Sequence, residues 1–304
     1  AYEIVSRDWS SDVCSSDLVG PDDDAFWATS GGMGLTGIIT GATLELQPVE
    51  TAYMVSDTER VPDVDECMSR MLEGDRDYRY SVAWIDCMAS GANLGRSVLT
   101  RGNHATAADL GHRHRSDPLA YAPRALLTAP PWLPDGLLNG ASVRAFNEFY
   151  RRRVPIAGRE RLRPFTEFLY PLDALHDWNR IYGPRGFYQY QCVVPREGAR
   201  DAVQALMDAI ARDGQGSFLA VLKTFGARDA AGWLSFPMPG VTLALDFPNL
   251  GQRTLDLQDT LDAVVREAGG RLYPAKDARM SRDLFEAGYP NLPPFLTFRD
   301  PGLS

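Results

Sequence analysis

Residues 187–195 read FYQYQCVVP, and they open the part of the chain whose pattern decides the fold. Aromatic and β-branched residues are frequent in this stretch, which predicts a β-strand. A helix is predicted next, because apolar residues recur at helical spacing over 203–210 and Gly214 follows as a stop.

Four further segments complete the pattern. SFLAVLKTFG (217–226) and VTLALDFP (241–248) predict two strands, apolar residues spaced helically over 257–268 predict a second helix, and RLYP (271–274) predicts a last strand. The order β-α-β-β-α-β is the ferredoxin-like arrangement. The sequence therefore predicts an α+β fold in which a ferredoxin-like unit lies on an antiparallel sheet.

The middle of the chain is predicted in less detail. Apolar residues at helical spacing predict a helix over 64–74, and YRYSVAWIDC (78–87) with LGRSVLTRG (94–102) predict a hairpin-like pair of strands. Residues 103–140 are rich in Pro, Ala and Leu and are expected to be irregular.

A glycine-rich stretch near the start, GMGLTG (32–37), satisfies the dinucleotide pattern G-x-G-x-x-G. That pattern normally follows a strand and opens a helix, but no strand pattern precedes it here. The residues that follow, IITGATLEL (38–46), are β-branched and partly alternating. We therefore expect a glycine loop that enters a strand, and not a Rossmann motif.

Composition excludes several classes of protein. A formal net charge of −9 argues against a nucleic-acid binder, and no apolar run is long enough to span a bilayer. Apart from Cys14, the cysteines (Cys67, Cys87 and Cys192) are scattered, which predicts buried thiols and no disulfide or metal site. Only Lys223 and Lys276 are lysines among 31 basic residues, so each deserves a chemical explanation.

Residues 1–18, AYEIVSRDWSSDVCSSDL, have no apolar period. When Asp8 to Leu18 are translated back into codons, the string resembles a common short-read library adapter. We interpret residues 1–18 as artefactual adapter translation and expect them to pack poorly, although a Ser/Asp-rich disordered terminus is the alternative.

Several strings carry a family resemblance in register from about Ala25 to Tyr289. They are FWATSGGMGLTGII (26–39), AWIDC (83–87), YPLDALHDWNRIYGPRGFYQYQ (170–191), LKTFG (222–226), SFPMPG (235–240) and GGRLYPAKDAR (269–279). Together they resemble the decaprenylphosphoryl-β-D-ribose 2′-oxidase family, which are FAD-linked oxidases of the vanillyl-alcohol-oxidase type.

The resemblance implies a domain plan. Residues 19–51 would be the C-terminal end of the first part of the FAD-binding domain, 52–271 the substrate domain, and 272–304 the start of a returning FAD-domain segment. It also implies a chain truncated at both ends, so we expect the fragment itself to be inactive.

The resemblance also implies a reaction and its partners. FAD would accept a hydride from the 2′-hydroxyl carbon of a polyprenyl-phosphate ribose, giving the 2′-keto sugar on the way to the arabinose donor for cell-wall arabinan. A short-chain reductase would complete the epimerisation, and a quinone would accept the electrons. A membrane-associated or periplasmic, cell-envelope location is implied, with a cytoplasmic one not excluded.

Family positions suggest site residues. Lys276 matches the active-site lysine, expected to act on the hydroxyl proton or as a fixed cation. Expected substrate contacts are Lys223, Gln189, Gln191, Trp84 and Asp246, and expected FAD contacts are Ile39, Gly34, Gly37 and Tyr273. The ordinary alternatives are surface lysines, a solvated strand face, a core tryptophan and a structural carboxylate.

Three positions depart from some family members. Ala244 stands where they carry a cysteine that traps nitroaromatic inhibitors, Thr242 where they have asparagine, and Leu169 where they have a pocket tyrosine. A related flavin oxidase of another sugar or alditol is therefore an alternative, and a non-catalytic ferredoxin-like binding module is another. The run Arg151 to Arg153 suggests peripheral contact with a lipid phosphate, although solvated charge is the commoner explanation.

Overall fold

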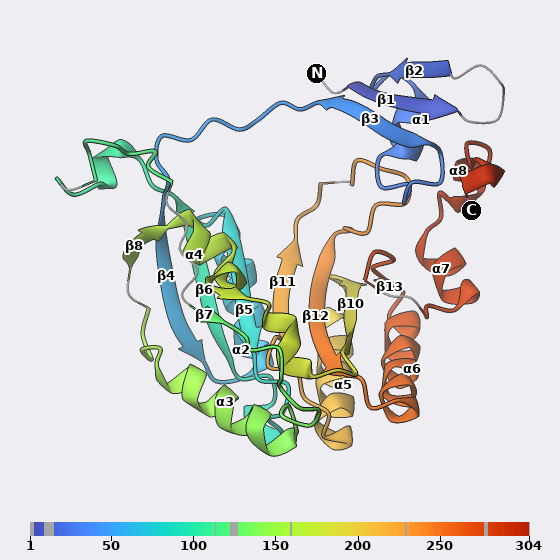
Figure 1. The fold of residues 1–304 in the computed structure, drawn as a ribbon. Coiled ribbons are helices and arrows are strands. Elements are labelled where there is room, and N and C mark those ends of the chain that lie inside the picture. Colours follow the sequence, from blue (N-terminus) through green and yellow to red (C-terminus); the bar gives the residue numbers. More distant parts are fainter. Residues whose placement is uncertain are drawn as a thin grey trace.

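The computed structural model describes residues 3–8, 15–112, 114–121, 127–158, 160–228, 230–276 and 279–303. An eight-stranded sheet, antiparallel at every pairing, forms its centre (Figure 1). Its strand order is β13-β10-β12-β11-β5-β6-β4-β8. The bounds are β4 Tyr53–Val61, β5 Tyr80–Ile85, β6 Ser97–His104, β8 Arg161–Pro164, β10 Phe187–Pro195, β11 Val221–Phe225, β12 Gly240–Pro248 and β13 Arg271–Leu272. The predicted α+β class with an antiparallel sheet is confirmed.

The two halves of this sheet share one order of elements. One half runs β4-α2-β5-β6-α3-β8, with α2 Val64–Gly74 and α3 Gly140–Arg152. The other runs β10-α5-β11-β12-α6-β13, with α5 Ala199–Asp213 and α6 Gln252–Glu267. In each half the first strand lies between the fourth and the third, and the halves meet where Val221 of β11 pairs with Trp84 of β5.

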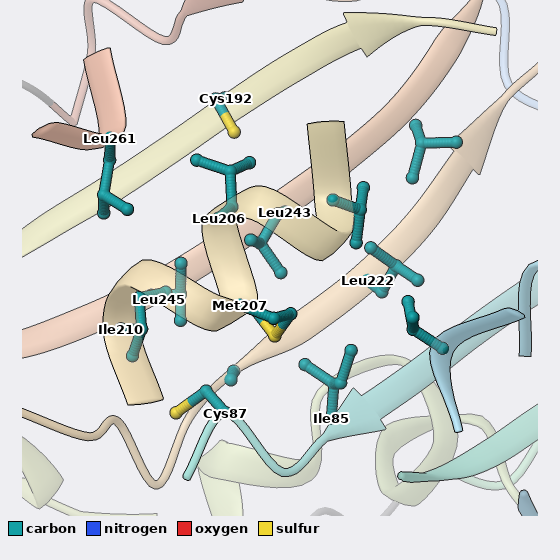
Figure 2. Close-up of a cluster of buried hydrophobic side chains, with 14 of the residues drawn as sticks. Ile85, Cys87, Cys192, Leu206, Met207, Ile210, Leu222, Leu243, Leu245 and Leu261 are labelled. Carbon is teal, nitrogen blue, oxygen red and sulfur yellow. The ribbon is translucent and has the colours of Figure 1, made fainter. Parts of the chain in front are cut away.

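Helices α2, α5 and α6 pack on one face of the sheet and form the main core with it. Figure 2 shows Leu206, Met207 and Ile210 of α5 pointing at strand residues such as Leu222 and Leu243. These side chains are at most 1% exposed. Helix α5 ends at Gly214, whose φ of 80° is the left-handed conformation that favours glycine. The apolar residues at helical spacing over 203–210 therefore form the buried face of α5.

Three elements of the first half were not predicted. These are β4 and β8, which lie at one end of the strand order, and α3, whose Tyr150 contacts Trp84 on β5. Helix α3 begins after Asn139, whose side chain accepts hydrogen bonds from the backbone N–H groups of Ala141 and Ser142. Its apolar residues Val143, Phe146 and Tyr150 recur at helical spacing, although only Val143 and Asn147 are buried in the fold.

The stretch from 103 to 140 is largely irregular, as expected, where the structure describes it. Short elements occur in this stretch or elsewhere between β5 and β10: η1 Gly91–Asn93, η2 Ala107–Asp109, β7 Leu127–Thr128, α4 Phe165–Leu169, η3 Pro171–Ala174, β9 Leu175–His176 and η4 Trp178–Tyr182. Strands β7 and β9 pair in parallel.

The beginning and the end of the chain pack together beside the main sheet. Elements here are α1 Asp24–Thr29, β3 Ile38–Thr43, α7 Arg282–Gly288, α8 Leu292–Phe295 and η5 Pro301–Leu303. Ala28, Leu234, Tyr289 and Phe295 form a second, smaller buried cluster. The backbone N–H of Asp300 donates to the carbonyl of Leu35 at 2.7 Å, which fastens the end of the chain to the glycine loop.

Part of the first eighteen residues forms strands. β1 Glu3–Asp8 pairs with β3 on one side and with β2 Ser15–Val19 on the other. Residues 1–2 and 9–14, and the side chains of 3–8 and 15–17, lie outside the described residues. The expectation that residues 1–18 pack poorly therefore falls outside what the structure describes.

Among the described helices, we find none with the length and apolar character that crossing a membrane requires.

Candidate functional site

Strand register brings the five expected substrate residues to one face of the main sheet. Gln189 on β10 lies opposite Asp246 on β12, and Lys223 on β11 lies opposite Thr242 on β12. Because side chains alternate along a strand, these residues point away from the face that carries Leu222, Leu243 and the helices. Trp84 joins them, since its partner Val221 is two residues from Lys223 on the same strand.

Hydrogen bonds hold both glutamines in place. Nε2 of Gln189 donates to Oδ1 of Asp246 at 3.2 Å, and Nε2 of Gln191 donates to Oγ1 of Thr242 at 3.2 Å. Both side chains are half-buried. A fixed amide on a half-buried surface can recognise a hydroxyl group with little loss of side-chain entropy.

The charge of Lys276 acts on both Asp246 and Lys223. Burial raises the pKa of Asp246 to about 6, and the Gln189 hydrogen bond and the charge of Lys276 oppose that rise. Burial lowers the pKa of Lys223, and the charge of Lys276 lowers it further. The structure thus brings Lys276 within electrostatic reach of Asp246 and Lys223, although the three residues come from three segments.

Lys276 is positioned by a turn that follows β13. The backbone N–H of Tyr273 donates to the carbonyl of Gln191 at 2.9 Å, and the N–H of Lys276 donates to the carbonyl of Tyr273 at 3.0 Å. The Tyr273 ring stacks on Phe236, with centroids 4.7 Å apart. Lys276 is exposed, so its amino group is accessible at the end of the sheet.

Trp84 lies where the candidate site adjoins helix α3. Its Nε1 donates to the carbonyl of Phe218 at 2.9 Å, and its ring contacts the ring of Tyr150 with centroids 4.8 Å apart. The ring is half-buried, and strand register directs it away from the main core.

The expected FAD contacts fall into two places. Tyr273 lies beside the sheet residues, whereas Gly34, Gly37 and Ile39 belong to the segment around β3, which Figure 1 draws apart from the sheet. Gly34 and Gly37 have φ of 76° and 150°, and the loop enters β3 as expected. A Cβ on Gly34 would meet no atom within 4 Å, and Ile39 is 50% exposed. The backbone and an apolar side chain are thus open to a ligand here.

Sequence reasoning named Thr242 only as a departure from other family members, and it missed Phe236 and Tyr150. Thr242 bonds Gln191, Phe236 stacks on Tyr273, and Tyr150 contacts Trp84. The period-2 rule applied to 242, 244 and 246 places Thr242 on the same face as Asp246 and so points to it. Tyr150 was missed because its helix was not predicted, although Val143, Phe146 and Tyr150 recur at helical spacing.

The described cysteines are buried and free, as expected. They are Cys67, Cys87 and Cys192, and burial raises the pKa of each thiol. Within the described part of the chain, no group of three or more His, Cys, Asp and Glu side chains is arranged to hold a metal ion.

Comparison with known proteins finds several relatives of this chain. It is 40% identical over 281 residues to the decaprenylphosphoryl-β-D-ribose oxidase of Mycolicibacterium smegmatis, a match that covers 92% of this chain and 60% of that protein. It is 34% identical over 308 residues to an uncharacterized protein in the mprA 5′ region of Streptomyces coelicolor, covering 98% of this chain and 81% of that protein. No family model matches.

Identity of 34% and 40% over almost the whole chain is far above what unrelated sequences share. The chain spans about 60% of the length of the M. smegmatis relative. The chain therefore belongs to the family of the decaprenylphosphoryl-β-D-ribose oxidases.

Proposed function

We propose that this chain is part of an FAD-dependent oxidoreductase that oxidises the 2′-hydroxyl of decaprenylphosphoryl-β-D-ribose to the 2′-keto sugar. The observation that carries the proposal is the match to the M. smegmatis oxidase across 92% of this chain. The gathering of the only two lysines with Gln189, Gln191 and Asp246 on one surface supports it.

We assign the domains as the sequence suggested. Residues 52–271 form the substrate domain, and the element and strand order of its second half supports a ferredoxin-like unit. Residues 19–51 and 272–304 belong to the FAD-binding domain. The packing of α1 and the glycine loop against α7 and α8 supports this assignment, because it joins segments from opposite ends of the chain.

The exposed residues fit a flavin. Ile38 and Ile39 are 47% and 50% exposed, and the preceding loop leaves its backbone open at Gly34. An apolar, flat ligand would cover this surface, and glycine allows the close backbone approach that such a ligand needs. When bound, FAD would supply the acceptor for the hydride that leaves the sugar.

The side chains of the sheet face then take distinct roles. Gln189 and Gln191 hydrogen-bond sugar hydroxyls, and the ring of Trp84 packs on the apolar side of the sugar. Lys223 and Asp246 bind and orient polar groups of the substrate. Lys276 accepts the hydroxyl proton at Nζ, or holds its charge there, as the C2′–H bond breaks.

The substrate, the partner enzyme and the electron acceptor follow from the same proposal. A polyprenyl-phosphate ribose is the substrate, a short-chain reductase consumes the 2′-keto product, and a quinone reoxidises the flavin. An envelope-side, membrane-associated location suits a substrate with a polyprenyl chain.

Lys276→Met tests the reaction. In a version of the protein that includes the flanking sequence of its gene, we expect the variant to lose turnover of the lipid-linked ribose, because the proposed proton acceptor or fixed charge at Nζ of Lys276 is removed. Flavin absorbance of the purified variant should match the unsubstituted protein. Undiminished turnover would remove Lys276 from its proposed role.

Two controls separate the competing functions. Turnover of other sugars or alditols in preference to the lipid-linked ribose would favour a related oxidase, to which the departures at Thr242 and Ala244 point. If the version that includes the flanking gene sequence purifies without flavin absorbance, that result would favour a non-catalytic binding module.

A further inference from the structure

A cavity of about 310 Å³ lies on the same face of the sheet as the candidate site, at the other end of the strand order. Its polar lining comes from four elements and the residue that follows one of them: Thr58 on β4, Thr100 on β6, Tyr150 on α3, Arg153 directly after α3, and Arg161 and Arg163 on β8. The proposed oxidation assigns no role to these side chains, although Tyr150 contacts Trp84 of the candidate site.

Register explains why the arginines of β8 face the cavity. Arg163 lies opposite Met54 and Arg161 opposite Ser56, and residues directly opposite on neighbouring strands share a face. Thr58 and Thr100 are also opposite each other. Thr58 shares the face of Met54 and Ser56 by alternation, so all these side chains project to the side away from α2.

The positive charge of the cavity is not neutralised within the described residues. No acidic side chain lines it, and none of Arg153, Arg161 and Arg163 forms an ion pair there. Arg96, Arg101 and Arg152, by contrast, each pair with one or more carboxylates. Three unpaired guanidinium groups around one cavity are unfavourable in a free protein and become favourable when an anion binds.

Hydroxyl groups complete the lining. Oγ1 of Thr58 accepts from Nη2 of Arg163 at 3.4 Å and from Oγ1 of Thr100 at 3.3 Å. Its own O–H donates to no partner that the structure describes, and it can therefore donate into the cavity. Burial raises the pKa of the Tyr150 hydroxyl, and the nearby charges of Arg163 and Arg153 oppose that rise, so the hydroxyl stays protonated and is available as a donor.

The sequence run Arg151 to Arg153 does not act as a unit. Arg152 pairs with Glu148 on the outer side of α3, whereas Arg153 lies against the Phe149 ring at 5.5 Å and lines the cavity. The cation cluster is therefore made by the fold from Arg153, Arg161 and Arg163.

We propose that this cavity binds a phosphate group through the guanidinium groups of Arg153, Arg161 and Arg163 and the hydroxyls of Thr58 and Tyr150. Guanidinium forks match phosphate oxygens with paired hydrogen bonds, and three of them match its multiple charge. The shared ligand chemistry is a phosphate ester or phosphate ion, supplied by a lipid headgroup or by a free phosphate compound. Binding does not depend on oxidation, so its test stands apart from that of the proposed function.

Calorimetric titration of the full chain with inorganic phosphate, at constant ionic strength in chloride, tests whether a free phosphate compound binds. Vesicles of phosphatidylcholine with and without phosphatidylglycerol, assayed by co-sedimentation, test whether a lipid headgroup binds. We expect saturable binding in one or both assays, weakened about tenfold by Arg161→Gln, because one charge-assisted hydrogen bond contributes at least that much.

Arg161 is the first variant because it is exposed and forms no described side-chain hydrogen bond, so its loss leaves the fold intact. Arg163→Lys is the second variant. It keeps the positive charge at this position but should retain only part of the phosphate affinity, since lysine lacks the guanidinium fork. Arg200→Gln is the matched control, because Arg200 is an exposed, paired arginine on α5 at the opposite face of the sheet.

Loss of phosphate binding in Arg161→Gln identifies a free phosphate ligand, and loss of sedimentation with anionic vesicles alone identifies a lipid headgroup. The proposal is overturned if neither probe binds, if Arg161→Gln and Arg163→Lys bind as tightly as the unsubstituted chain, or if Arg200→Gln weakens binding equally.

Discussion

Asp246 is a carboxyl group that folding keeps partly uncharged. It is only 7% exposed, and it accepts one hydrogen bond from Gln189. Burial raises its pKa from 3.8 to about 6. Below the unfolded pKa both states hold the proton, and between about pH 4 and pH 6 only the folded state holds it. The contribution of this group to stability is therefore lost as pH rises through that window.

We predict that Asp246→Asn removes this pH dependence. The asparagine keeps a carbonyl oxygen for Gln189 but cannot ionise, so the variant should gain stability relative to the natural chain by up to roughly 3 kcal/mol between pH 4 and pH 7. Urea unfolding at a series of pH values measures the difference. Parallel stability curves for the two proteins would contradict the prediction.

Lys223 is sensitive to Lys276 because both charges lie at the same end of the sheet face. The pKa of Lys223 is below 10.5, first because of burial and then because of Lys276. We predict that Lys276→Met raises the pKa of Lys223, and that Lys276→Arg, which keeps the charge, leaves it low. Since the chain has only these two lysines, ¹³C resonances of labelled lysine measure the pKa directly. An unchanged value in Lys276→Met would show that the amines are not coupled.

At the scale of the element, α5 is held by one apolar face. Leu206, Met207 and Ile210 are fully buried between this helix and the sheet, whereas Asp208 of the same helix is exposed. The stability of the helix therefore rests on packing more than on propensity.

We predict that Leu206→Ala lowers the free energy of unfolding by about 2–5 kcal/mol, because it opens a cavity that the rigid sheet cannot fill. Asp208→Ala, on the exposed side of the helix, should change it by less than about 0.5 kcal/mol. Denaturant unfolding of both variants checks the pair, and equal effects would mean that the buried face is not what holds α5.

The helices and strands differ in how well the sequence predicted them. The segment of β10, α5, β12 and α6 was predicted within a few residues, because each of these elements carries its own apolar period. Helix α3 was not predicted, although Val143, Phe146 and Tyr150 recur in it at helical spacing. Strand β8 has four residues, too few for a period to show.

At the scale of the whole molecule, the two ends of the chain form a cluster of their own. Phe295 is 1% exposed and packs with Ala28, Leu234 and Tyr289, none of which belongs to the main core. A small cluster joined to the sheet by few elements should open more easily than the sheet itself.

We predict that Phe295→Ala loosens this cluster alone. Amide hydrogen exchange should quicken at Trp233 and Asp300, whose N–H groups bond the carbonyls of Trp27 and Leu35, and should stay unchanged in β12. Leu296→Ala is the control, because Leu296 follows directly and is 49% exposed. Equal quickening in β12 would show that the cluster and the sheet open as one unit.

The sequence by itself determined the local elements of the second half and, through the family resemblance, the set of candidate residues from Trp84 to Lys276. It did so because apolar periods and short strings are properties of contiguous residues. Only the tertiary structure decided that Gln189 lies against Asp246, that Lys276 acts on Lys223, and that Arg153 shares a cavity with Arg163. Those relations depend on strand register between segments distant in the chain, and no local pattern encodes the register of a remote partner.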